Sequence, residues 1–64
     1  MTQTVANQID AIGIVNRMSD EEIASAAIST QLCDSICMRH SNGDMRPLMT
    51  VLSVRDLCME RLGW

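Results

Sequence analysis

The chain has 64 residues, a net charge of −3, a single Trp and neither Phe nor Tyr. This length leaves room for one domain, 1–64. The net negative charge disfavours nucleic-acid binding, because nucleic-acid-binding proteins usually have a basic face. The hydrophobic fraction of 47% is too high for a disordered tail. We therefore expect one small folded domain whose core is built from aliphatic side chains.

Localisation is predicted from what the sequence lacks. No apolar run approaches the ~20 residues of a membrane span, and the first residues lack the charged and apolar regions of a signal peptide. The chain has three cysteines, and an odd number without a signal peptide indicates reduced thiols. We expect a cytoplasmic protein with no contact to a membrane.

The first predicted helix covers about residues 4–18. Ile9 and Ile12 recur at helical spacing and form part of a broad apolar arc. Asn16 continues the same stripe, so a polar side chain interrupts a face that we expect to be buried. Asn16 is therefore a candidate contact residue.

A second, longer helix is predicted over 20–40. Ser19 and Glu22 have the spacing of a capping box, in which each side chain binds the backbone N–H of the other residue. Arg39 and His40 complement the negative end of the helix dipole just before a Ser-Asn-Gly turn. We find no helix-breaking residue between these two signals and expect one continuous helix.

A third helix is predicted over 45–62. Pro47 is tolerated in its first turn, and an apolar stripe then runs from Leu48 to Leu62. A connection of about four residues makes the last two helices antiparallel neighbours. The predicted fold is all-α, with three helices dominated by the antiparallel hairpin of 20–40 and 45–62 and with the first helix packed across it.

The predicted helices also indicate self-association. Three amphipathic helices with broad apolar arcs have more apolar surface than 64 residues can cover. We therefore expect a homodimer or a larger helical assembly.

A cysteine and histidine cluster is the most evident candidate for a metal site. Cys33, Cys37 and His40 project from roughly one side of the predicted second helix, and Cys58 could join them from the third. Three thiolates and one imidazole form a zinc ligand set, but three ligands on one straight helix cannot readily surround a tetrahedral ion. We expect the thiols to act as small core side chains and His40 to cap its helix, with no metal and no cofactor.

Catalysis is not expected either. A nucleophile pair of Cys37 and His40 would need an orienting group and an oxyanion hole, and the sequence has no glycine-rich loop or phosphate-binding motif to supply one. We predict a non-enzymatic protein without catalytic residues.

Charged side chains inside the apolar stripes are more informative. Asp34 and Arg55 lie where helical projection predicts burial, and the predicted hairpin brings them within a turn of each other. They could form an ion pair inside one chain or between chains, or both could be solvated beside a narrower stripe. With Asn16, the adaptable Met59 and the terminal Trp64, they are the candidate partner-binding residues.

The leading functional hypothesis is a small regulator or inhibitor that binds a larger protein through a helical surface. One alternative is a dimeric DNA-binding transcriptional regulator. Residues 23–30 superficially resemble the start of a helix-turn-helix, but they lack its glycine and a break in the helix. DNA binding would fall steeply with salt and would be lost on changing Arg39 or Arg46. A further alternative is an oligomer that captures a small ligand between subunits.

Overall fold

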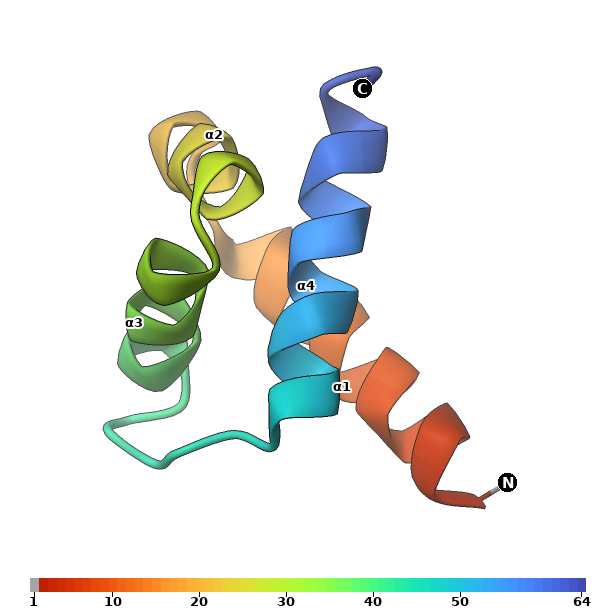
Figure 1. Cartoon of the computed structure of the whole chain (residues 1–64). Coiled ribbons are helices and arrows are strands. Elements are labelled where there is room, and N and C mark those ends of the chain that lie inside the picture. Colours follow the sequence, from red (N-terminus) through yellow and green to blue (C-terminus); the bar gives the residue numbers. More distant parts are fainter. Residues whose placement is uncertain (1) are drawn as a thin grey trace.

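The computed structural model describes the backbone of residues 2–64 and the side chains of residues 8–64. Four α-helices and no strand make up this part of the chain, as Figure 1 shows: α1 (Thr2–Arg17), α2 (Asp20–Ile28), α3 (Thr30–His40) and α4 (Leu48–Arg61). The predicted all-α class is confirmed, whereas the predicted number of three helices is wrong. None of the described helices has the length and hydrophobicity of a bilayer span.

The predicted continuous helix over 20–40 is wrong, because Ser29 divides it into α2 and α3. Ser29 has an extended backbone, with φ −138° and ψ 126°, and its N–H donates to the carbonyl of Ser25 at 3.2 Å. Its Oγ accepts a hydrogen bond from the N–H of Leu32 at 3.3 Å, as an N-cap side chain does. Serine competes with helical backbone bonding in this way, so a helix can end here without glycine or proline.

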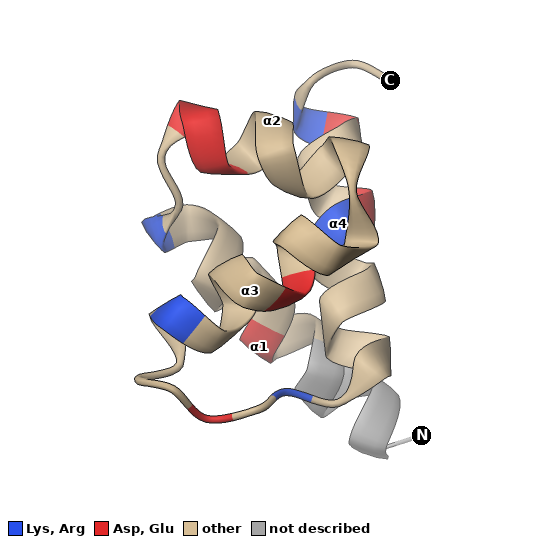
Figure 2. Ribbon diagram, turned by 60° about the vertical axis from the view of Figure 1, so that its left-hand side comes forward, with Lys and Arg blue, Asp and Glu red and all other residues tan. Residues whose placement is uncertain are grey.

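The start of α2 agrees with the prediction. Ser19 is its N-cap, and both hydrogen bonds of the capping box are present. The acidic first turn, red in Figure 2, lies at the positive end of the helix dipole.

Left-handed residues end α3 and α4. Asn42 and Gly43 have φ of 59° and 87°, and the N–H of Gly43 donates to the carbonyl of Met38 at 2.8 Å. Pro47 then serves as the N-cap of α4, which begins at Leu48 and not at residue 45. Gly63, with φ 77°, follows the end of α4.

The helices pack around α4. This helix contacts α1, α2 and α3, and α1 runs behind it in Figure 1 while α2 and α3 lie to one side. The predicted antiparallel hairpin is not confirmed, since α1 shares the most extensive contact with α4 and the partner helix of the hairpin is broken.

All four helices contribute to one core. Its buried side chains are aliphatic or sulfur-containing: Ala11, Ile14, Val15, Met18, Ile23, Ala26, Ala27, Cys33, Ile36, Cys37, Val51, Val54 and Cys58. The face of α1 that enters this core contains Ala11, Ile14, Val15 and Met18. The predicted apolar stripe of Ile9 and Ile12 is instead exposed to 65% and 50%.

Candidate interaction surface

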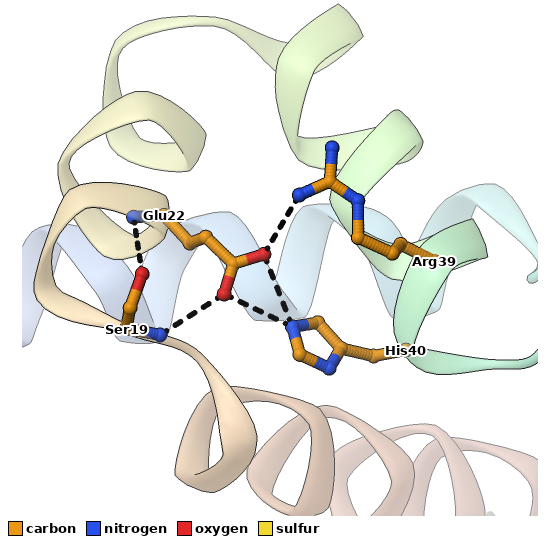
Figure 3. A network of polar contacts seen from close by, with 4 residues as sticks. All are labelled: Ser19, Glu22, Arg39 and His40. Carbon is orange, nitrogen blue, oxygen red and sulfur yellow. Dashed lines mark hydrogen bonds and ion pairs between the residues drawn. The ribbon is translucent and has the colours of Figure 1, made fainter.

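Glu22 holds the beginning of α2 against the end of α3 (Figure 3). Its carboxylate accepts a hydrogen bond from the backbone N–H of Ser19 at 3.0 Å, and Ser19 Oγ accepts one from the N–H of Glu22 at 3.2 Å. The same carboxylate lies 3.2 Å from His40 Nε2 and 3.3 Å from Arg39 Nη1. The hydrogen bond from Ser19, followed by His40 and Arg39, lowers the pKa of Glu22 against the opposing effect of burial. These polar groups serve to clamp two helices together.

The three cysteines lie in the core, and His40 is directed away from them to Glu22. Each thiol is fully buried, and Cys33 Sγ donates to the carbonyl of Val51 at 3.3 Å. The neighbouring thiol of Cys37, together with burial, raises the pKa of Cys33, and burial raises the pKa of Cys58. The hydrogen bond with Cys33 lowers the pKa of Cys37, so burial is the property that all three thiols share. Thiols closed off from solvent in this way are typical of structural cysteines.

In residues 8–64, no three His, Cys, Asp or Glu side chains form a group that could hold a metal ion. Among the described side chains, Cys33 and Cys37 pack in the core, and His40 contacts the carboxylate of Glu22.

Arg46 ties the loop between α3 and α4 to α1. Its Nε donates to Ser41 Oγ at 2.8 Å, and its Nη1 donates to Asp10 Oδ2 at 3.2 Å. Arg39 is similarly paired with Glu22. Both arginines on which DNA binding was predicted to depend are thus engaged by carboxylates, which leaves less positive charge for a phosphate backbone.

The predicted partner-binding residues lie at three separate places. Asn16 is exposed on α1 beside α4, whereas Asp34, Arg55 and Met59 are half-buried on α3 and α4. Trp64 follows the last helix and is 66% exposed. The structure does not bring these five residues together into one site.

Arg55 caps a helix instead of pairing with Asp34. Its Nε donates to the carbonyl of Ala27 at 3.3 Å. That carbonyl belongs to the last turn of α2, where the break at Ser29 removes in-helix donors and where a cation complements the helix dipole. The described residues contain no ion pair between Asp34 and Arg55. The helix break, which the sequence did not reveal, thus gives Arg55 its role.

A groove of about 310 Å³ lies between α1 and α4. It is lined by Ile12, Val15, Asn16, Leu57, Glu60 and Arg61, which we call the α1–α4 groove. A second hollow of about 300 Å³ shares Ile12, Leu57 and Glu60 with it and extends toward Gln8 and Ser53. At the edge of the groove, Arg61 Nη2 donates to Asn16 Oδ1 at 3.2 Å. The groove therefore has an apolar floor and a hydrogen-bonded polar rim.

Sequence reasoning missed this groove because α1 has two overlapping apolar stripes. The spacing of Ala11, Ile14, Val15 and Met18 is a helical face as regular as that of Ile9 and Ile12. Asn16 was the one sequence feature that could have indicated which stripe faces solvent, because a polar residue in line with Ile12 is typical of an exposed stripe.

No family model, curated protein or solved structure matches this chain. The geometry of its own side chains is therefore the basis for a functional assignment. Large apolar side chains are exposed on all four helices and near both ends of α4: Ile9, Ile12, Ile28, Leu32, Met45, Leu48, Met49, Leu52, Leu62 and Trp64. Single exposed apolar residues are ordinary, but contiguous ones are typical of binding surfaces.

Proposed function

We propose that this chain is a non-enzymatic regulator or inhibitor that binds a larger protein in its α1–α4 groove. The observation that carries this proposal is the half-exposed Ile12, which lies beside Leu57 in a groove with a polar rim. An apolar centre surrounded by polar groups is the usual composition of a protein interface.

The shape of the groove suggests the kind of partner segment. It runs between two helices, and its apolar residues Ile12, Val15 and Leu57 form a surface that suits an amphipathic helix or a large apolar side chain. Asn16, Glu60 and Arg61 supply hydrogen-bonding groups at the edge. A cytoplasmic location fits the three free thiols, which persist in a reducing compartment.

A second candidate is DNA binding. The break at Ser29 gives two short consecutive helices, and the lack of such a break had counted against a helix-turn-helix. A single residue joins them, however, where a helix-turn-helix uses a turn of about 3–4 residues. Binding to DNA would appear as a complex whose affinity falls steeply with salt.

The proposed function is tested by affinity capture from the source organism with the immobilised chain. We expect the wild type to retain a protein partner and Ile12→Asp to lose it, because a carboxylate would be placed in the apolar groove. Leu32→Asp is a matched control, since Leu32 is 49% exposed against 50% for Ile12 and lies outside the groove. Equal capture by both variants, or recovery of nucleic acid alone, would contradict the proposal.

A further inference from the structure

Two half-buried charged side chains lack an oppositely charged partner among the described residues. Of the half-buried Asp, Glu and Arg residues in 8–64, Glu22 and Arg46 each form an ion pair. Asp34 has no hydrogen bond or ion pair among the described residues, and Arg55 uses only its Nε, to bind Ala27. A partly desolvated charge is costly when it is left without an opposite charge. Asp34 and Arg55 are therefore one acidic and one basic side chain that can each accept an oppositely charged partner.

These two charges lie where α3 runs beside α4. Cys33 Sγ is bonded to the carbonyl of Val51, so the helices are in contact at that level. Asp34 directly follows Cys33, and Arg55 is one helical turn beyond Val51. Figure 2 shows a red segment of α3 close to a blue segment of α4. The acid and the base thus share one side of the molecule.

Apolar side chains surround Arg55 on the same face of α4. Leu48, Leu52 and Met59 are separated from Arg55 by seven, three and four residues, spacings that align side chains along a helix. Leu48 is 65% exposed, Leu52 is 36% exposed and Met59 is half-buried. We call these three residues, with Asp34 and Arg55, the α3–α4 face.

We propose that the α3–α4 face is the contact of a two-fold symmetric homodimer, in which Asp34 of each chain pairs with Arg55 of the other. In a two-fold interface every contact occurs twice, so a face that holds one acid and one base is complementary to itself. An unrelated partner would have to supply both opposite charges at matching positions, whereas a second copy supplies them automatically.

The chemistry of the pair suits this arrangement. The guanidinium Nη atoms of Arg55 can bind a carboxylate while Nε keeps its bond to Ala27. The contact also removes Leu48 and Leu52 from water, which favours association. This inference is independent of the proposed function, because the α1–α4 groove shares no residue with the α3–α4 face.

Sedimentation equilibrium of the full chain tests the dimer through paired charge reversals. We expect the wild type to be dimeric and Asp34→Arg or Arg55→Asp alone to weaken dimerisation at least about tenfold, because like charges would then face each other. An equimolar mixture of the two variants should regain the dimer, since each contact across the interface is again between Arg and Asp. Rescue by mixing requires the pair to join different chains.

Two further variants separate the α3–α4 face from the α1–α4 groove. Leu48→Glu should abolish the dimer and, with an exposed side chain, should leave the fold intact. Ile12→Glu, in the groove, should leave the dimer unchanged. If Arg55→Asp fails to fold because its bond to Ala27 is lost, Leu48→Glu still decides the question. A monomeric wild type, a dimer insensitive to Leu48→Glu, or folded charge variants that do not recover on mixing would overturn the proposal.

Discussion

Single side chains determine where the helices of this protein begin and how their ends are joined. Ser19 Oγ caps α2 and Ser29 Oγ caps α3, each by accepting the backbone N–H three residues later. Glu22 joins the start of α2 to the end of α3, and Arg55 joins the end of α2 to the middle of α4. Because these bonds involve few atoms, each can be tested by one substitution.

Ser29→Ala removes the side-chain cap of α3. We expect a loss of unfolding free energy of about 1 kcal/mol, within the usual range of about 0.5–2 kcal/mol for an N-cap, measured by urea denaturation followed by circular dichroism. Ser29→Asp should restore most of the stability, since Asp also caps helices. Ser35→Ala is the control, because Ser35 Oγ only donates to Gln31 within α3. An unchanged midpoint for Ser29→Ala would show that the cap contributes nothing.

Glu22 makes stability depend on pH in the acidic range. Its folded-state pKa lies below its ordinary value of 4.5, so the folded state releases this proton more readily than the unfolded state. The resulting stabilisation is fully present above pH 4.5 and is lost as the pH falls through the lowered pKa.

Glu22→Gln isolates this effect, because Gln can keep the capping-box bond but carries no charge. Wild type should be more stable than Glu22→Gln above pH 4.5, and the difference should shrink on acidification. Urea denaturation of both proteins at a series of pH values measures it. A difference that stays constant as the pH falls would argue against ionic stabilisation by Glu22.

Among the helices, the features that depend on neighbouring residues could be predicted from the sequence more readily than the packing of one helix on another. The capping box at Ser19, the glycine after α3 and the apolar core thiols could all be predicted, since each depends on nearby residues or on residue type. The break at Ser29 could not, because Ser and Thr occur both inside and at the ends of helices. Whether α2 and α3 separate is decided by how each packs on α4, which is a long-range contact.

The buried face of α1 is a second case of this kind. Its two apolar stripes have similar hydrophobicity, and only contact with α4 decides that Ile14 enters the core while Ile12 lines the groove. The same uncertainty about the buried face of α1 applies to the site residues. Asn16 could be recognised from the sequence as a polar residue in an apolar stripe, but its contact with Arg61 depends on the orientation of α1.

Matched substitutions test the orientation of α1. Ile14 is 1% exposed and Ile12 is 50% exposed. Ile14→Val should reduce the unfolding free energy by about 0.5–1.5 kcal/mol because it removes a buried methyl group. Ile12→Val should change it by less than about 0.5 kcal/mol. Thermal denaturation of the two variants measures this contrast, and equal losses would show that α1 is rotated from the orientation described.

For the whole molecule, a small core and extensive exposed apolar surface occur together. The buried side chains are mostly small, and several of the largest aliphatic ones lie outside, among them Ile9, Leu48 and Met49. A chain of 64 residues gains limited stability from its own core, so binding is a further source of stabilisation. The α1–α4 groove and the α3–α4 face use different residues of α4, so the proposed dimer would leave the groove open to the proposed partner.

The proposed binding of a larger protein in the α1–α4 groove can be mapped onto single residues. Amide chemical shifts of the isotope-labelled chain, recorded with and without the captured partner, test it most directly. We expect the shifts to change around Ile12, Asn16 and Leu57, which lie in the groove. Changes confined to the outer side of α2 and α3, around Leu32 and Ser35, would contradict it.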